Sequence, residues 1–522
     1  MAMNTQGRPT APGAATTSDI PTFSGHRGLD HEEPLLFERG RLDTTGVDLP
    51  DAPRIASRLG GLERQGDIGL PGLSEPETMR HYVRLSRKNY AIDSGLYPLG
   101  SCTMKHNPRL NEKMARLAGF GDIHPLQPQS TVQGALDLMH MLGEYLMELT
   151  GMPAVTLSPK AGAHGELAGM LAIKAAHDAK GSTRNVVLVP ESAHGTNPAT
   201  AAFMGYVVKS IPAKKDGTVA AADVKAALGP DVAAIMLTNP NTCGLFEPEI
   251  VEIAKAVHDA GAYFYCDGAN FNAIVGKVRP GDLGIDAMHI NLHKTFSTPH
   301  GGGGPGAGPV VLSEALAPFA PVPFVRKGGK GLELVEHESG SAEMKPFGRL
   351  TAFHGQMGMF VRALSYMLSH GSDGMRQASE DAVLNANYVR VGLRDVMTQP
   401  FGDKPCMHEV LFDDAWLKDT GVTTLDFAKA MIDEGYHPMT MYFPLVVHGA
   451  MLIEPTESES RDTLDRFIHS MSALAKAAKA GDVERFKGAP RYAPRRRLDE
   501  TKAAREPKLT WKAPAPGKQA AE

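Results

Sequence analysis

The sequence has few cysteines and no long apolar run, and these absences exclude several classes of protein. Four cysteines lie far apart among the 522 residues, and no two of them form a Cys-x-x-Cys pair. We therefore expect neither a disulfide framework nor a structural zinc site, and the composition fits a reducing compartment. The sequence contains no run of 18 apolar residues, which is about the length that a membrane-spanning helix needs.

The charge balance gives no sign of an anionic partner, and the N-terminus gives no sign of a targeting sequence. The chain has 54 lysines and arginines against 59 aspartates and glutamates, a formal net charge of −5, which gives no general attraction to nucleic acids or anionic membranes. Residues 1–19 contain no apolar core and one arginine, so they resemble neither a secretory signal nor a mitochondrial presequence. We therefore expect a cytoplasmic protein that binds no nucleic acid, no membrane and no metal.

What the chain does have is an alternation of short apolar runs with helical patterns. The helical pattern at 247–261 is typical, with Pro248 near its start and Gly261 at its end. This alternation predicts an α/β fold with a mostly parallel, doubly wound sheet. The apolar runs with the length and β-branched content of buried strands are 186–190, 206–211, 233–238, 262–267, 287–292 and 309–313.

The pattern changes near residue 350, where residues 350–371 predict a long helix. Two further strand patterns, at 408–412 and 450–455, alternate with helical patterns and indicate a second, smaller α+β domain. The last residues are basic, contain several prolines and are poor in apolar side chains. The predicted parts are a partly extended N-terminal arm (1–80), a large cofactor-binding α/β domain (81–365), a small α+β C-terminal domain (366–485) and a basic flexible tail (486–522).

Chemically capable side chains follow several of the predicted strands. Lys294 follows the strand at 287–292, Asp267 ends the strand at 262–267, and His194 comes soon after residue 190. Because ligands bind at the carboxyl ends of strands in open α/β sheets, we expect these side chains to meet at one edge.

Three more elements belong to the same predicted site. Asn241 and Thr242 follow the strand at 233–238. Gly162 and Ala163 open a helical pattern, and the free N–H groups of a helix N-terminus suit a phosphate.

A lysine, a carboxylate, an imidazole and a phosphate cradle together suit pyridoxal 5'-phosphate (PLP). The lysine amine forms a Schiff base with the cofactor aldehyde, and the carboxylate keeps the ring nitrogen protonated so that the ring can accept electrons. The imidazole would stack on the ring, and hydroxyl or amide groups would bind the phenolic oxygen. Each residue also has an ordinary interpretation, as a surface lysine, a helix-capping aspartate or a surface histidine, and it is the ordered set that predicts the site.

Two other motifs indicate different kinds of site, but the residues around each motif exclude that site. Gly301, Gly303 and Gly306 match G-x-G-x-x-G, but they precede a strand, whereas a dinucleotide-binding motif opens a helix. His164-Gly165-Glu166 resembles the start of a zinc deaminase signature, yet the required Pro-Cys-x-x-Cys is missing. The glycines after Lys294 either let the backbone approach a ligand closely or form a mobile loop.

Blocks distributed over residues 80–465 resemble the PLP-bearing subunit of the split P-proteins of the glycine cleavage system. That resemblance implies fold type I, the aspartate-aminotransferase-like fold of PLP-dependent transferases. The blocks include YPLGSCTMKHNP (97–108), AGAHGELAG (161–169), SAHGTNPATA (192–201), TNPNTCGLFE (238–247), CDGANFNA (266–273), NLHKTFSTPHGGGGPG (291–306) and RLTAFHGQMG (349–358).

The resemblance also implies the roles of the residues. Lys294 would be the Schiff-base lysine, Asp267 would pair with the pyridine nitrogen, and His194 would stack on the ring. Of the remaining candidates, Gly162 and Ala163 would lie at the phosphate, and Asn241 and Thr242 at the phenolic oxygen.

The implied activity is glycine dehydrogenase (aminomethyl-transferring), in which glycine loses CO2 and its aminomethyl group passes to the oxidised lipoyl arm of H-protein. The implied partners are a separate subunit 1, in an α2β2 heterotetramer, and lipoylated H-protein. A stand-alone PLP-dependent amino-acid decarboxylase or aminotransferase of the same fold is the alternative. A catalytically silent scaffold is a further one, although the presence of Lys294 argues against it.

Overall fold

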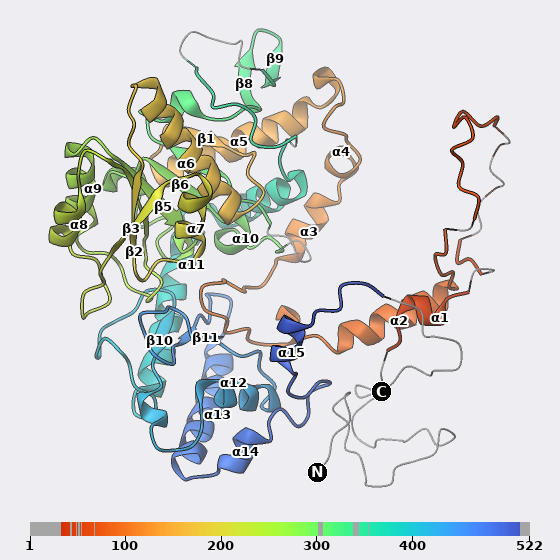
Figure 1. Cartoon of the computed structure of the whole chain (residues 1–522). Coiled ribbons are helices and arrows are strands. Elements are labelled where there is room, and N and C mark those ends of the chain that lie inside the picture. The colour runs from red at the N-terminus through yellow and green to blue at the C-terminus, as the bar shows by residue number, and fades with distance from the viewer. Residues whose placement is uncertain are drawn as a thin grey trace. The chain divides into compact units, whose positions relative to one another are not determined.

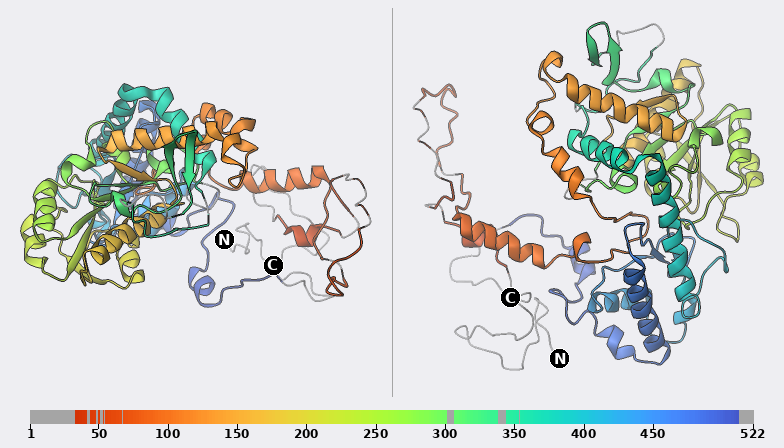
Figure 2. Two further views of the ribbon diagram at one scale, coloured as in Figure 1. Left: turned by 90° about the horizontal axis from the view of Figure 1, so that it is seen from above. Right: turned by 180° about the vertical axis from the view of Figure 1, so that it is seen from behind.

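The computed structural model describes residues 33–511, except for 42–43, 48–49, 51–52, 54, 67, 301–305, 338–343 and 353. The chain divides into two compact units. The first comprises Met1–Ala91, Ile432–Gly435 and Glu484–Glu522, and the second comprises Ile92–Met431 and Tyr436–Val483. Figures 1 and 2 show the chain from three directions.

The first unit contains short helices that local interactions stabilise. Helix α2 begins after a capping box, in which the Glu77 carboxylate accepts hydrogen bonds from the Ser74 backbone N–H (3.0 Å) and hydroxyl (2.7 Å). The aromatic rings of Phe37 and Trp511 stack with their centroids 5.0 Å apart. The helices lying within this unit are α1 (Leu36–Arg39), α2 (Glu75–Arg87) and α15 (Glu500–Arg505).

The second unit is built on a seven-stranded sheet in the order β1-β7-β6-β5-β4-β2-β3. Strands β2 to β6 are parallel, and β7 runs antiparallel to both of its neighbours, β1 and β6. The predicted mostly parallel sheet is therefore confirmed. The strands are β1 (Ala154–Thr156), β2 (Val186–Pro190), β3 (Val207–Ile211), β4 (Val232–Thr238), β5 (Tyr263–Gly268), β6 (Ala287–Ile290) and β7 (Val310–Leu312).

Helices cover both faces of this sheet, because its strands are apolar on both sides. Tyr263 and Tyr265 of β5 pack on one face, in the cluster that includes α6 and α7, whereas Phe264 and Cys266 point to the opposite face. The helices of this part are α3 (Arg109–Ala115), α4 (Ala118–Gly121), α5 (Gln133–Thr150), α6 (Gly162–Ala179), α7 (Thr196–Phe203), α8 (Ala221–Ala227), α9 (Ile250–Asp259) and α10 (Leu292–Thr295).

The long helix α11 (Met357–Leu393) follows the sheet. The predicted helix at 350–371 begins seven residues late, at Met357, and bends at Gly371, whose φ is +64°. The predicted domain boundary between residues 365 and 366 falls inside α11, and the four-part division of the chain stays a prediction.

Beyond α11 lies a three-stranded antiparallel sheet, in the order β10-β12-β11. Its strands are β10 (Val410–Phe412), β11 (Thr440–Met441) and β12 (Met451–Ile453). The remaining elements are α12 (Thr424–Asp433), α13 (Arg461–Lys479), α14 (Val483–Lys487) and a separate hairpin of β8 (Phe324–Gly328) and β9 (Gly331–Val335).

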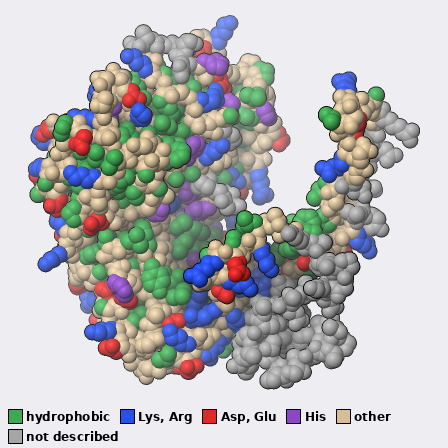
Figure 3. Space-filling view, viewed as in Figure 1, with side chains coloured by type: hydrophobic (Ala, Val, Ile, Leu, Met, Phe, Trp, Pro, Cys, Tyr) green, Lys and Arg blue, Asp and Glu red, His purple; other side chains and the backbone are tan. Residues whose placement is uncertain are grey.

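No helix among the described residues is long and apolar enough to cross a membrane. Basic and acidic side chains are interspersed on the face that Figure 3 shows, which matches the small net charge of the chain.

Candidate active site

A cavity of about 270 Å³ lies where the predicted residues meet, beside the carboxyl ends of β4, β5 and β6. The predicted site residues that line it are Gly162, Ala163, His194, Thr242, Asp267 and Lys294. Strands far apart in the sequence thus bring an amine, a carboxylate, an imidazole and a helix N-terminus to one edge of the sheet.

Lys294 lies in α10, the single helical turn that follows β6. The residue is only 8% exposed, so the interpretation as a surface lysine is wrong. Its amine donates a hydrogen bond to the Ser101 carbonyl oxygen at 2.7 Å. Ser101 has a φ of +64°, a conformation that costs free energy in a residue other than glycine. Tertiary contacts therefore hold Ser101 in place against Lys294.

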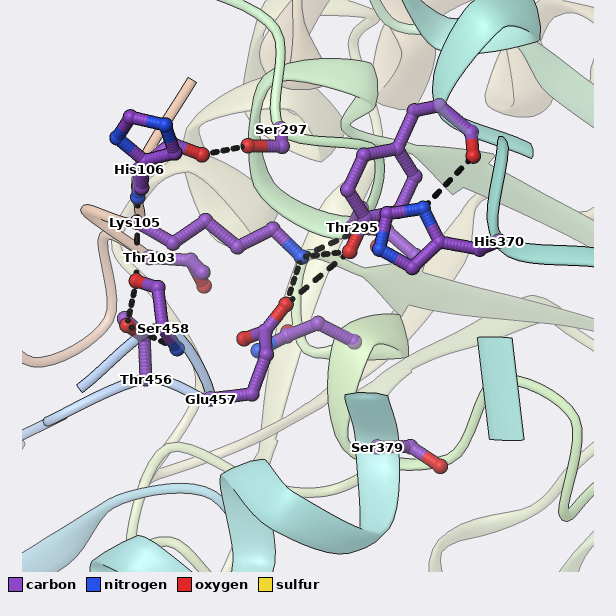
Figure 4. A network of polar contacts seen from close by, with 12 residues as sticks. Thr103, Lys105, His106, Thr295, Ser297, His370, Ser379, Thr456, Glu457 and Ser458 are labelled. Carbon is purple, nitrogen blue, oxygen red and sulfur yellow. Dashed lines mark hydrogen bonds and ion pairs between the residues drawn. The ribbon is translucent and has the colours of Figure 1, made fainter. Parts of the chain in front are cut away.

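The segment around Ser101 also clamps the chain just beyond Lys294. The ammonium of the buried Lys105 donates to the Thr295 carbonyl oxygen (2.9 Å) and to the Tyr366 hydroxyl (3.3 Å), and it forms an ion pair with Glu457. Figure 4 shows this side chain between Thr295 and Glu457. Burial lowers the pKa of Lys105, but the charges and hydrogen bonds of Glu457 and Tyr366 together outweigh it and raise that pKa above its ordinary value.

Asp267 is buried at the end of β5, and its two carboxylate oxygens have different partners. Oδ2 accepts from the Asn197 side chain at 3.1 Å, and Oδ1 accepts from the Ala269 backbone N–H at 2.9 Å. The Nε2 atom of His289 lies 3.4 Å from Oδ1. These contacts fix the carboxylate at the cavity wall, where it can bind a protonated ring nitrogen.

His289 connects Asp267 to the interior of the sheet. Its Nδ1 atom lies 2.6 Å from the Tyr265 hydroxyl, and its Nε2 atom lies 3.0 Å from Oδ1 of Asn291. Burial lowers the pKa of His289, so the ring is neutral at pH 7. His289 and Asn291 are not among the predicted site residues, although polar residues at alternate positions near the end of an apolar strand point to one face.

The N-terminus of α6 forms another wall. Its first N–H groups have no partner within the helix, which favours an anion there. A Cβ on Gly162 would lie 2.7 Å from Nδ2 of Asn291 and 3.2 Å from Nε2 of His289. Glycine is therefore needed at position 162, because the helix terminus packs tightly against the strand end.

His194 and Glu166 lie on the remaining wall. His194 is exposed, and its Nδ1 atom lies 2.8 Å from the Thr196 hydroxyl, which donates to Glu166 at 2.7 Å. Burial, and then the negative charge of Asp267, raise the pKa of Glu166. In the sequence, Glu166 belongs only to the incomplete zinc deaminase motif, but it lies one helical turn from Gly162 and so on the same face.

The two residues after β4 differ in their placement. Thr242 lines the cavity and donates its hydroxyl to the Ser192 carbonyl. Asn241 is not among the cavity-lining residues, and its side chain stabilises the local turn. Nδ2 donates to Glu247 at 2.7 Å, and Oδ1 accepts from the Cys243 backbone N–H at 2.9 Å. The structure therefore does not bring Asn241 to the cavity.

Most of the glycine-rich loop, residues 301–305, lies outside the described residues, so its predicted approach to a ligand stays a prediction. Gly306 is described, and a Cβ there would lie 2.8 Å from Cβ of His293 and 2.8 Å from the Pro299 carbonyl oxygen. This glycine is required by contacts within the chain itself.

Comparisons with known proteins agree with this geometry. The model of the glycine dehydrogenase C-terminal domain matches residues 378–492, and that of class-V aminotransferases matches 165–383. A probable glycine dehydrogenase (decarboxylating) subunit 2 from Caulobacter vibrioides is 69% identical over 100% of both chains. The chain belongs to this family. A second member, from Listeria monocytogenes, is 48% identical over 92% of this chain and 99% of its own.

Solved structures show the same fold at lower identity. A glycine decarboxylase (P-protein) of the glycine cleavage system superimposes with a TM-score of 0.66 at 21% identity, covering 80% of this chain and 93% of that one. A NifS-like protein superimposes with a TM-score of 0.57 at 12% identity, covering 73% and 99%. The predicted type I fold of PLP-dependent enzymes is therefore confirmed, and the lining residues of the cavity fit that cofactor.

Proposed function

We propose that this chain is the PLP-bearing half of a glycine dehydrogenase, which decarboxylates glycine and passes the aminomethyl group to an oxidised lipoyl disulfide. The observation that carries this proposal is the buried amine of Lys294, which lines one cavity together with Asp267 and the N-terminus of α6. The 69% sequence identity to a subunit 2 protein over the full length of both chains supports glycine as the substrate.

Different cavity residues hold different parts of PLP. Lys294 supplies the amine for covalent attachment, and the first turn of α6, at Gly162 and Ala163, binds the phosphate. When bound, PLP supplies an electron-accepting ring for the electrons that remain when CO2 leaves. Asp267 keeps the ring nitrogen protonated, and the buried, neutral His289 behind it keeps this carboxylate in position.

His194 and Thr242 complete the wall. We assign the exposed imidazole of His194 to the face of the ring, and the Thr242 hydroxyl to the phenolic oxygen. Asn241 is assigned a structural role instead, because its amide is used within the turn that it shares with Glu247.

The proposed partners are a subunit 1 and a lipoylated H-protein. The subunit 2 family name supports a separate subunit 1, and an α2β2 assembly and a cytoplasmic location are parts of the same proposal. An acceptor disulfide gives the aminomethyl group a destination, because decarboxylation leaves a carbon with a pair of electrons that would otherwise take up a proton. Attack of that carbon on one sulfur forms a C–S bond and breaks the S–S bond, so the second sulfur leaves as a thiolate. The lipoyl group is thereby reduced by two electrons.

An isotope-exchange experiment tests the proposal and its alternative. Labelled bicarbonate is incubated with glycine and the PLP-loaded chain, and subunit 1 or lipoylated H-protein is omitted in turn. We expect rapid exchange into the glycine carboxyl group only when all components are present. Full-rate decarboxylation of glycine by this chain alone would replace the proposal with a stand-alone decarboxylase.

A further inference from the structure

A chain of three polar side chains leads from His194 into the interior of the protein. Nδ1 of His194 lies 2.8 Å from the Thr196 hydroxyl, and that hydroxyl lies 2.7 Å from Oε1 of Glu166. All three residues line the cavity of the candidate active site. The proposed function assigns His194 to the ring of PLP, but it leaves Thr196 and Glu166 without a role.

The buried carboxylate of Glu166 is hydrogen-bonded at both of its oxygens. Oε1 accepts from the Thr196 hydroxyl, and Oε2 accepts from the Thr200 hydroxyl at 3.1 Å. The neighbouring carboxylate of Asp267 has a different donor, the side chain of Asn197. The two carboxylates therefore have separate partners on α7, and Glu166 can gain a proton while the contact of Asp267 persists.

The surroundings give both ends of this chain a proton affinity that suits neutral pH. Burial, and then the negative charge of Asp267, raise the pKa of Glu166 to about 7. A base is most effective when its pKa lies near the pH at which it works. Burial of part of the ring lowers the pKa of His194, so this ring is neutral at pH 7 and can accept a proton. The other titratable groups around these two residues are Tyr265, Asp267, His289 and Lys294.

The same three residues satisfy one another before and after a proton moves along the chain. While Glu166 is ionised, the Thr196 hydroxyl donates to it, and Nδ1–H of His194 donates to the hydroxyl oxygen. Once Glu166 is protonated, its O–H donates to Thr196, and the Thr196 hydroxyl donates to the bare Nδ1. The Thr196 backbone N–H, 3.3 Å from Nδ1, then donates to that nitrogen as well. One geometry therefore fits both ends of a proton transfer.

We propose that His194, Thr196 and Glu166 form a path that takes one proton from glycine as it enters the site. Thr196 and Glu166 act through His194 and are positioning residues. The inference rests on the proposed function, because it takes glycine as the substrate and His194 as the residue at the ring.

The proton that must move comes from the amino group of glycine. Glycine carries an ammonium group at pH 7, and its nitrogen must lose one proton before it can bond to the aldehyde carbon in place of Lys294. Nε2 of His194 accepts this proton, and Nδ1 passes its own proton to the hydroxyl oxygen of Thr196. That hydroxyl passes its proton to the carboxylate of Glu166. His194 and Thr196 end neutral, Glu166 ends protonated, and the glycine nitrogen gains the lone pair that it needs.

The test compares two amines that differ in whether they must lose a proton before they react. Glycine or hydroxylamine is mixed at pH 7 with subunit 1 and the PLP-loaded full chain, and the absorbance of the cofactor reports how fast each amine displaces Lys294. Hydroxylamine is mainly uncharged at this pH and needs no proton acceptor. Thr196→Val removes the hydroxyl link, so it should slow glycine about 100-fold and leave the hydroxylamine rate unchanged.

Three further variants make the comparison specific. Thr196→Ser retains a hydroxyl and should restore most of the glycine rate. Glu166→Gln should slow glycine as Thr196→Val does, because an amide does not take up the proton. Thr200→Val is the matched control, because Thr200 binds the other oxygen of Glu166 and lies outside the path. At a pH high enough to leave the glycine amine uncharged, the effect of Thr196→Val should disappear.

Other outcomes would overturn the inference. Equal slowing of both amines in Thr196→Val would show that the variant only disturbs the shape of the site, and an unchanged glycine rate would exclude the path. If Thr196→Val does not fold, infrared spectroscopy of the unmodified chain replaces it. A protonated carboxyl band that appears with glycine but not with hydroxylamine, and is lost in Glu166→Gln, supports the path, and its absence contradicts it. Failure of the unmodified chain to attach PLP at Lys294, or to react with glycine, would instead refute the proposed function.

Discussion

Two buried lysines in this chain show how their surroundings separate a structural cation from a reactive amine. Lys105 and Lys294 are 5% and 8% exposed, and each donates to a backbone carbonyl oxygen. Lys105 also contacts the carboxylate of Glu457 directly. Among the described residues, no carboxylate forms such an ion pair with Lys294, although Glu166 and Asp267 line the same cavity. Direct pairing with Glu457 fixes Lys105 as a structural cation, whereas the side chain of Lys294 lines the cavity.

Removing the reactive amine should have the largest effect. Lys294→Ala is expected to abolish covalent PLP attachment and all glycine decarboxylation, because the amine is the attachment point. The fold should persist, since Lys294 contributes one hydrogen bond, to Ser101. Intact mass after borohydride reduction and circular dichroism measure the two outcomes. A normal PLP adduct on the variant would assign the attachment to another lysine.

Removing the negative charge of Asp267 should have the second-largest effect on activity. Asp267→Asn is expected to retain bound PLP but to lose about 100-fold or more in the rate of decarboxylation, because a neutral amide holds the ring nitrogen protonated poorly. The absorbance spectrum reports the bound cofactor, and CO2 release reports the rate. Asp286→Asn provides a buried-aspartate control, since Asp286 contacts His258 and the Phe264 N–H. Near-normal turnover in the Asp267 variant would leave Asp267 with a structural role.

Removing the structural cation, Lys105, should have the opposite effect, because it should lower the stability of the fold and leave PLP attachment intact. Lys105→Met leaves Glu457 without its ion-pair partner, and breaking a buried ion pair in this way costs about 3–5 kcal/mol. Denaturant unfolding measures the loss, and PLP should still attach at Lys294. The double variant Lys105→Met/Glu457→Gln should recover part of the lost stability. A loss of attachment in a variant that remains folded would end the distinction between the two lysines.

The phosphate end of the cavity should give the smallest effect. Gly162→Ala places a Cβ 2.7 Å from Nδ2 of Asn291, and overpacking of this kind costs about 1–3 kcal/mol. The dissociation constant for PLP is expected to rise by about tenfold, as measured by fluorescence titration. Gly134→Ala in α5 is the control, because no atom lies within 4 Å of its added Cβ. Equal affinities in both variants would show that α6 does not hold the phosphate.

The sequence predicted the elements that local patterns determine. Buried apolar runs place β2 at its observed limits and β5 within one residue, and Lys294 and Asp267 follow from the carboxyl ends of strands. The contact that holds the amine of Lys294 is not local. Ser101 lies 193 positions from Lys294 and 308 from Glu409, and no periodicity in the sequence reports such a contact.

Two further differences between the predictions and the structure have similar causes. The residues from Leu350 to Gln356 continue an apolar pattern, but the helix begins only at Met357. Asn241 has the polarity of a cofactor ligand, yet its own turn uses its amide. In both cases the composition of the segment was compatible with the prediction, and the surrounding structure determined a different outcome.

The most direct measurement is to locate the lysine that carries PLP in the unmodified chain. Borohydride reduction fixes the cofactor covalently, and proteolysis with mass spectrometry then identifies the modified peptide. The distinction between the two buried lysines predicts an adduct on the peptide containing Lys294 and none on the peptide containing Lys105. An adduct on Lys105, or no adduct on Lys294, would contradict it.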